Sequence, residues 1–479
     1  MIHLPILAII APLGYAFLVQ LLELVSNRAR RVGVVLCGAA QIAVLILLIP
    51  RVAAEEVVIY HLGGWGPRMG IVLMVDGFSL LFALLSAVGI WLVSLYSLDY
   101  VEAGEYRYFV LLFIVSAGVT GMLLTGDLFN LYVFFELASM ASFPLIAYAR
   151  TPGSVEAAFR YMVYSTIAAT FILLAIGLTY GATGSLNLEQ AAEGLRAADP
   201  LIRRVVLGLL VVGFSIKMAL FPFHAWLPEA YTRAPAPITA LLSGVLSKTG
   251  VYALVRLLLV FGQGMDLIRL EMVLLNLGAI TVVAGHWLAM GQANFKRALA
   301  YSSIAHLGII AMGLGVGTVA GLAGMLSHTI NHMVMKSAVF FAIGRLGFGR
   351  GHDTVHMKGT ARRAPLATLA FIASALSLIG VPPFAGFIGK WEITLDVLRQ
   401  QHFVLALAIP LGTLLSAVYF GRMVQTLFSE SDSEAGQAAG GGRLTGAVLI
   451  AGAAGCLIPF LLWQQMAPVL LQIATSVRS

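Results

Sequence analysis

About fourteen stretches of roughly 20 apolar residues follow one another along this chain, separated by short polar segments. Such a stretch can cross a bilayer as a helix, and lipid-embedded backbone must satisfy its own hydrogen bonds. Of the 479 residues, 60% are hydrophobic and only 11% are charged, against about 25% charged in soluble domains. The sequence therefore predicts an all-α polytopic membrane protein with about 14 transmembrane helices. The lipid bilayer is its main solvent, and residues 1–479 form one membrane domain.

The distribution of positive charge predicts the orientation of these helices. With the N-terminus outside, the inner loops hold 16 of the 29 Lys and Arg residues and the outer loops hold 8. Cytoplasmic loops are enriched in Lys and Arg, so both termini are expected outside the cytoplasm. The basic cluster 28–31 follows the first apolar run, which favours a retained first span over a cleaved signal. The candidate spans are 2–25, 32–50, 73–98, 107–125, 127–148, 157–180, 203–222, 233–261, 270–290, 298–316, 320–348, 365–390, 403–428 and 444–475.

Several classes of function are excluded by what lies between the spans. The net charge of +7 is dispersed over short loops, so no nucleic-acid partner is expected. The two cysteines, Cys37 and Cys456, lie far apart in apolar segments and have no metal-ligand spacing. No cysteine cluster or Gly-rich nucleotide loop is present, so no cofactor is expected. Residues 429–443 are rich in Gly and Ser and predict a flexible inner linker.

Five ionisable residues lie inside the apolar stretches: Glu136, Lys217, Lys248, Lys336 and Lys390. Ionisable groups are costly in hydrocarbon, and within a membrane they mark ion pathways or proton relays. All four deep cations are lysines, which change protonation state when buried more readily than arginines do. The pattern is typical of a proton path; the alternative is a small set of buried ion pairs.

Glu136 falls near the middle of the span 127–148 and needs a partner to stay ionised. Lys217 is the expected partner, because opposite charges about 4 Å apart attract by roughly 4 kcal/mol at an effective dielectric of 20. Closing the pair would hold a proton on Lys217, and opening it would let the desolvated amine release that proton. A static structural ion pair is the alternative.

Histidines add to the lysines in two neighbouring spans. His328, His332 and Lys336 are spaced four residues apart, so they share one helix face. Neutral histidine both donates and accepts, and it titrates near physiological pH. Tyr301, Ser303 and His306 on the preceding span supply further polar groups for a water path. No metal is expected, since the His pair lacks a neighbouring Glu and a third ligand; ordinary hydrogen-bonded core histidines remain the alternative.

Two similar segments, about 160 residues apart, each combine a lysine with a helix break. The first begins at Lys217 and contains Pro222 and Pro228, and the second contains Pro382 and Pro383 and ends with Lys390. Breaks at matching positions of two halves point to a midplane site in an inverted-repeat transporter, whereas ordinary proline kinks are the alternative. Lys390 is interpreted as the terminal relay, although it has the length to snorkel to the interface.

The sequence beyond Lys217 carries further polar groups. His224 and Glu229 are expected either to line a water-filled access path or to cap the broken helix. Arg256, two turns beyond Lys248, is expected to reach the outer interface by snorkelling.

Four motifs together carry a family resemblance: GDLFNLYVFFELASM, KMALFPFHAWLPEAYTRAPAPITALLSGVLSKTGVYALVR, KRALAYSSIAHLGII and HTINHMVMKSAVFFAIGRL. They resemble the proton-conducting membrane subunits shared by respiratory complex I, membrane-bound hydrogenases and the multisubunit Mrp sodium/proton antiporters, over roughly residues 70–430. The stretch FNLYVFFEL is most similar to the D-type subunit of the Mrp antiporters.

The resemblance implies a fold of fourteen spans with two inverted five-helix repeats, here 107–261 and 270–428, and broken helices 7 and 12. It also implies that Glu136 and Lys217 form a coupling pair, and that Lys248 and Lys390 relay protons. The implied activity is proton translocation within a multisubunit complex of the bacterial or archaeal cell membrane, with other membrane subunits as partners and sodium as a second candidate ion. A redox-driven complex, such as complex I or a hydrogenase, and a non-conducting assembly scaffold are the alternatives.

Overall fold

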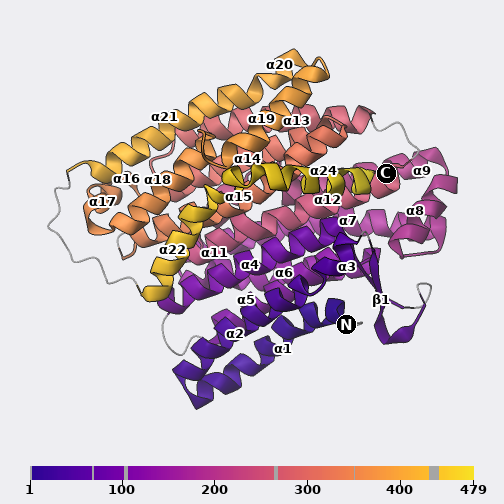
Figure 1. Cartoon of the computed structure of the whole chain (residues 1–479), viewed down its shortest axis with the longest axis horizontal. Coiled ribbons are helices and arrows are strands. Elements are labelled where there is room, and N and C mark those ends of the chain that lie inside the picture. Colours follow the sequence, from indigo (N-terminus) through magenta and orange to yellow (C-terminus); the bar gives the residue numbers. More distant parts are fainter. Residues whose placement is uncertain are drawn as a thin grey trace.

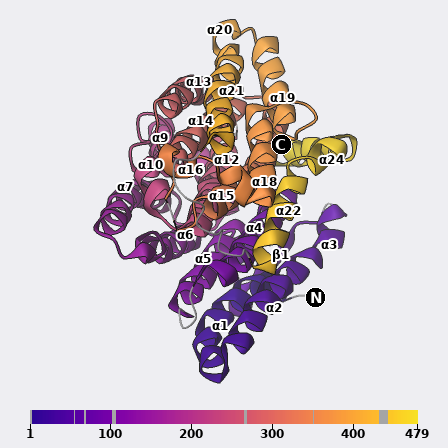
Figure 2. The ribbon, with the colours of Figure 1, turned by 90° about the vertical axis from the view of Figure 1, so that its left-hand side faces the viewer.

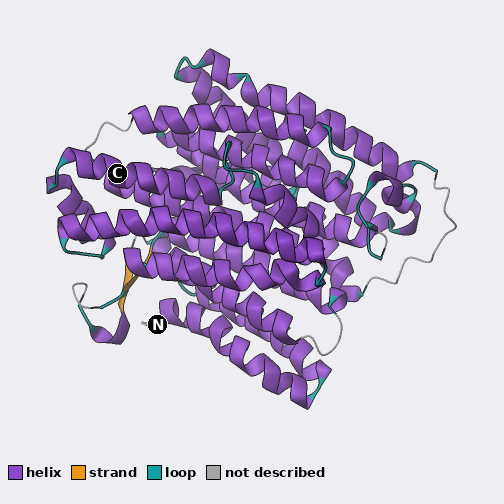
Figure 3. Ribbon diagram, turned by 180° about the vertical axis from the view of Figure 1, so that it is seen from behind, coloured by secondary structure: helices purple, strands orange, loops and turns teal. Residues whose placement is uncertain are grey.

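The computed structural model describes residues 3–54, 56–66, 70–101, 106–263, 268–349, 351–430 and 442–478. Helices form nearly all of this described part, and most of them run side by side along one common direction (Figure 1, Figure 3). A single short hairpin pairs strand β1 (Val58–His61) antiparallel to β2 (Val72–Val75) in the described residues. The predicted all-α polytopic fold is confirmed.

The first helices form one edge of the bundle. Asp76 caps helix α4 (Gly77–Tyr100) by accepting a hydrogen bond from the Ser79 amide, as expected of an N-cap residue. The elements are α1 (Leu4–Val25), α2 (Asn27–Ile46), α3 (Ile49–Ala53), η1 (Leu62–Gly64), α4 (Gly77–Tyr100), α5 (Tyr106–Leu124), α6 (Leu128–Ile146), η2 (Ala147–Ala149) and α7 (Pro152–Thr183).

The middle of the chain contains the first broken helix and a π-helical turn. Its elements are α8 (Leu188–Ala197), α9 (Pro200–Lys217), α10 (Trp226–Arg233), α11 (Ala236–Leu241), the π-helical turn η3 (Leu242–Leu246) and α12 (Ser247–Gly262).

The last part contains the second broken helix and ends in a helix that packs against the long helix Val319–Leu346. Its elements are α13 (Ile268–Met290), α14 (Phe295–Gly315), α15 (Val319–Leu346), α16 (Thr354–Met357), α17 (Thr360–Arg363), α18 (Pro365–Ile379), α19 (Gly386–Arg399), α20 (Phe403–Ala406), α21 (Ala408–Phe428), α22 (Arg443–Gly455), α23 (Ile458–Leu461) and α24 (Trp463–Arg478). Most of the predicted linker 429–443 lies outside the described residues.

Each of the fourteen predicted spans corresponds to helical structure. Within the described residues, eleven helices are long and apolar enough to cross a membrane. The three other predicted spans correspond to α9, to α15 and to the broken pair α18 and α19. Helices α9 and α15 are less apolar because they carry charged or imidazole side chains, and the third span is divided between two shorter helices.

Both predicted breaks are present. Helix α9 ends at Lys217 and α10 begins only at Trp226, with a cis Phe221–Pro222 bond between them. Helix α18 ends at Ile379 and α19 begins at Gly386, with a cis Pro382–Pro383 bond between them. In contrast to the predicted span 365–390, α19 continues to Arg399, so Lys390 lies inside a helix and not at its end.

The centre of the bundle is occupied by α15, which packs against α11, α14, α18, α19, α22 and α24 (Figure 2). In Ala236–Gly262 and in Phe295–Gly315, 94% of the most apolar 18-residue stretch is buried inside the protein. Lys248, Lys296 and His306 on these helices are therefore buried inside the protein. The two chain ends lie at the same end of the bundle (Figure 1), as an even number of crossings requires.

Candidate functional site

Four histidines gather at the centre of the bundle. His328 and His332 on α15 are fully buried, as predicted from their shared face, and so is His306 on α14. The His306 Nδ1 and His328 Nε2 atoms are 3.1 Å apart, and the His306 ring stacks on both His328 and His332 with centroids 5.2 and 4.9 Å away. The structure thus brings together three residues that sequence reasoning placed on two separate spans.

The fourth histidine was missed by sequence reasoning. His286 on α13 is also fully buried; its ring centroid lies 5.8 Å from that of His306, and its Nδ1 lies 3.2 Å from the Tyr419 hydroxyl. Its position inside the apolar span 270–290 was the available signal, but it lacks the four-residue spacing by which His328 and His332 were selected.

Several ring nitrogens of this cluster have no hydrogen-bond partner among the described residues. They are His286 Nε2, His306 Nε2, His328 Nδ1 and both nitrogens of His332. Buried polar atoms in proteins nearly always have a partner, and buried water supplies it where protein does not. These nitrogens are therefore available to accept or donate a further hydrogen bond.

A second polar network joins Lys248 to Lys336. The Lys248 Nζ donates to the Ser243 carbonyl and, over 3.1 Å, to the Ser247 hydroxyl. The Ser243 hydroxyl lies 3.0 Å from that of Ser303 on α14. Ser303 in turn donates to the Leu299 carbonyl over 2.9 Å, and the same carbonyl accepts from Lys336 Nζ over 3.0 Å.

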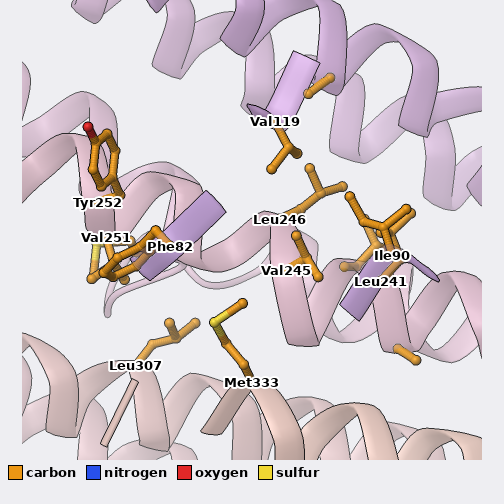
Figure 4. Close-up of a cluster of buried hydrophobic side chains, with 14 of the residues drawn as sticks. Phe82, Ile90, Val119, Leu241, Val245, Leu246, Val251, Tyr252, Leu307 and Met333 are labelled. Atoms are coloured by element: carbon orange, nitrogen blue, oxygen red, sulfur yellow. The ribbon is translucent and has the colours of Figure 1, made fainter. Parts of the chain in front are cut away.

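The π-helical turn η3 provides the carbonyl that Lys248 binds. A π-helical turn shifts the backbone hydrogen-bond pattern, and such turns occur frequently at functional sites. Apolar side chains enclose this region: Val245, Leu246 and Val251 lie beside Leu307 and Met333 (Figure 4). The hydroxyls, carbonyls and imidazoles are therefore the polar groups available to a proton here.

Glu136 and Lys217 do not form the ion pair predicted from the sequence. Both residues are described, and Lys217 Nζ instead donates to Ser139 and Tyr161, each over 2.8 Å, and to Ser165 over 3.3 Å. Glu136 Oε1 is buried without a hydrogen-bond partner in the described structure. Ser139 lies one helical turn from Glu136, so the ammonium is held close to the carboxylate but apart from it.

Lys390 is buried, with only 5% of its surface exposed, and does not snorkel to the interface. Its Nζ donates to the carbonyls of Leu378 and Ile379 over 2.8 and 3.0 Å. These carbonyls belong to the end of α18, so the lysine binds backbone groups freed by the helix break. Gly389 packs α19 directly against His328, since a Cβ there would lie 2.6 Å from the His328 backbone.

Arg256 was expected to snorkel but forms a buried ion pair. Its guanidinium contacts the two carboxylate oxygens of Asp76 at 2.6 and 2.7 Å. Burial alone would raise the pKa of the Asp76 carboxyl; the Arg256 charge and the hydrogen bonds from Arg256 and Ser79 outweigh it and hold that pKa below its usual value. The pair joins α12 to the start of α4.

Of the residues predicted to line an access or water path, Ser303 and His306 belong to the central networks, whereas His224 and Glu229 make other contacts. Glu229 is paired with Arg297 at 3.1 Å, and the His224 ring stacks on Phe221 with centroids 5.0 Å apart. Tyr301 is half-buried on α14. No group of three or more His, Cys, Asp or Glu within the described ranges is arranged to hold a metal ion.

Residues 125–416 match the family model described as "NADH:quinone oxidoreductase/Mrp antiporter, TM". The chain belongs to this family. It is 37% identical over 437 residues to the N-type subunit of the NADH-quinone oxidoreductase of Desulforudis audaxviator, covering 89% of this chain and 86% of the relative. It is also 33% identical over 424 residues to the D-type subunit of the Na(+)/H(+) antiporter of Bacillus subtilis, covering 86% and 84%.

Solved structures agree with this assignment. A chain of the membrane-bound sulfane sulfur reductase, an archaeal respiratory membrane complex, matches with a TM-score of 0.93 and 30% identity, covering 99% of this chain and 98% of that chain. A chain of the Mrp complex from Dietzia sp. matches with a TM-score of 0.91 and 25% identity, covering 100% and 97%. The family resemblance predicted from the four motifs is confirmed.

Proposed function

We propose that this chain is a proton-translocating, antiporter-like subunit of a multisubunit cation/proton antiporter of the Mrp type in the cell membrane. Protons move along intramembrane side chains and the water held between them. The relay residues are Glu136, Lys217, Lys248, His328, His332, Lys336 and Lys390. The observation that carries the proposal is the row of buried amines and imidazoles at the centre of the bundle.

The hydrogen bonds of the lysines support a relay over a set of static ion pairs. Lys217, Lys248, Lys336 and Lys390 are bound to hydroxyls and carbonyls, and none is paired with a carboxylate among the described residues. A buried ammonium without a counter-ion releases its proton at a smaller cost than one locked in a salt bridge. Lysine is suited to this role because, unlike arginine, it releases its proton within proteins.

The Lys217 site supports a gating role. Its ammonium is held by Ser139, one turn from Glu136, which corresponds to the open form of the predicted pair. Movement of the ammonium by about one helical turn would close the pair and retain the proton on the lysine. The two broken helices, α9–α10 and α18–α19, support a division into the inverted repeats 107–261 and 270–428.

Coupling energy comes from partner subunits or from an ion gradient. Moving one charge against 100 mV costs about 2.3 kcal/mol, comparable to opening one ion pair. The Bacillus subtilis relative is named as part of a Na(+)/H(+) antiporter, which supports sodium as the exchanged ion of the assembled complex. The loops predicted to lie on the side away from the two chain ends hold more Lys and Arg than the other loops, which supports termini outside the cytoplasm.

A redox-driven complex is the second candidate, because the relative at 37% identity is named as part of an NADH-quinone oxidoreductase. The set of subunits that copurify with the chain decides between them. Small membrane subunits alone support the antiporter, and soluble cofactor-binding subunits support the redox complex.

The proposal is tested by proton flux in liposomes containing the purified complex. Lys217→Ala and Lys248→Ala should each abolish coupled flux while the complex still assembles, whereas Arg160→Ala, an exposed residue paired with Glu156, should not change it. Wild-type flux in both lysine variants would support a non-conducting scaffold instead.

A further inference from the structure

A fifth buried lysine lies at the end of the bundle where α14 begins. Lys296 is only 2% exposed, although the sequence pattern placed it among the ordinary loop charges. The next residue, Arg297, has a side chain that is 40% exposed and paired with Glu229. Lys296 is therefore buried, although the adjacent cation in the same helical turn is partly exposed.

The surroundings of Lys296 do not favour a permanent positive charge. Its Nζ donates to the Ala234 carbonyl, and it forms no ion pair within the described part of the chain. It lies in the first turn of α14, where the helix dipole is positive and disfavours a cation. A purely structural contact with one carbonyl would not require an ionisable amine at this position.

Lys296 begins a polar stripe along one face of α14. The stripe consists of the side chains of Lys296, Ser303 and His306, at steps of seven and three residues, with the Leu299 backbone carbonyl between the first two in sequence. Leu299 accepts from both Lys336 and Ser303, and His306 contacts His328. Over about 15 Å of helix, the stripe runs from the end of the bundle, where Lys296 lies, to the two central networks.

The loop before α16 closes over the start of α14 and adds one more imidazole. Phe295 donates to the His352 carbonyl over 2.8 Å, and Thr354 donates to the Ala293 carbonyl over 2.9 Å. Burial, with contributions from the charges of Lys296 and His356, lowers the pKa of His352 to about 3. The His352 Nε2 atom is buried without a hydrogen-bond partner in the described structure, so it is available to accept a hydrogen bond.

We propose that Lys296 is the residue through which the central relay exchanges protons with the aqueous face at this end of the bundle. The ammonium of Lys296 gives one proton to a water molecule or hydroxyl along the stripe, and the resulting amine takes one proton from bulk water at that face. No electron moves, and no bond to carbon forms or breaks. The inference rests on the proposed proton translocation and adds the point of access from one side.

The test compares variants of the purified complex in liposomes, with assembly checked by size-exclusion chromatography. Lys296→Met should reduce proton flux to the level of Lys248→Met. Lys296→His should retain flux, with a pH midpoint shifted toward that of imidazole, about 6.5. The shift in the pH midpoint should appear only when pH is changed on the aqueous side at the end of the bundle where Lys296 lies. Lys358→Met removes a less buried lysine near the same end of the bundle and should leave flux unchanged.

The outcomes separate this inference from the proposed function. Wild-type flux in Lys296→Met together with lost flux in Lys248→Met would overturn the access role and leave the relay intact. Wild-type flux in both variants would overturn the relay itself. If Lys296→Met does not assemble, Lys296→His decides, because a structural lysine predicts no pH shift confined to one face.

Discussion

The buried pair of Asp76 and Arg256 gives a stability prediction that can be worked from the structure. Asp76→Asn keeps an N-cap acceptor for the Ser79 amide but removes the negative charge opposite a guanidinium whose side chain is 7% exposed. Removing one partner of a buried pair costs about 3–5 kcal/mol. The Asp76 side chain is 22% exposed, so solvent screening places the expected loss near the lower value, about 3 kcal/mol.

Thermal melting in detergent measures this loss. An unfolding entropy of about 2.1 cal/mol/K per residue, over 479 residues, is about 1 kcal/mol/K, so the midpoint should fall by about 3 °C. Glu156→Gln, which breaks an exposed pair with Arg160, should change the midpoint by less than about 1 °C. Equal midpoints for the two variants would refute the reasoning.

The same pair predicts a pH dependence with a definite sign. The folded-state pKa of Asp76 is depressed, so the stability it contributes is fully present above the unfolded pKa, about 3.9, and is lost as pH falls through the folded value. The difference in melting temperature between the wild type and Asp76→Asn should therefore shrink below about pH 4.

Three further predictions concern other parts of the structure. Gly389→Ala places a Cβ 2.6 Å from the His328 backbone, so melting should show a loss of about 1–3 kcal/mol; an unchanged midpoint would contradict the close packing. Ser303→Ala removes the 3.0 Å contact with Ser243, and proton flux should fall while stability changes by about 1 kcal/mol; full flux would show that the hydroxyl is dispensable. His352 has a pKa of about 3 when folded, so wild-type stability should decline relative to His352→Asn as pH falls from about 6.5 toward about 3, and parallel melting curves would contradict this.

The sequence alone predicted the helical membrane fold, the two helix breaks and the burial of the deep lysines. These features follow from strong local signals: long apolar runs, prolines beside lysines, and histidines spaced along one helix face. The burial of Lys390 and the shared face of His328 and His332 depend on such short-range patterns.

The hydrogen-bond partners were less predictable, because partners are chosen by packing between distant helices. Lys217 binds Ser139 and Tyr161 in place of Glu136, and Arg256 binds Asp76 across 180 residues of sequence. Lys296 adjoins a short polar loop, so nothing in its local sequence distinguished it from Arg297. The Ala234 carbonyl that binds it and the segment around His352 that packs on Phe295 are both distant in sequence.

The central claim is that the buried amines of this chain move protons and do not simply carry fixed charge. Lys248→Arg tests it directly, because arginine preserves the positive charge but does not release a proton in proteins. Proton flux in liposomes containing the assembled complex should be lost in this variant. Wild-type flux with arginine at this position would contradict the account.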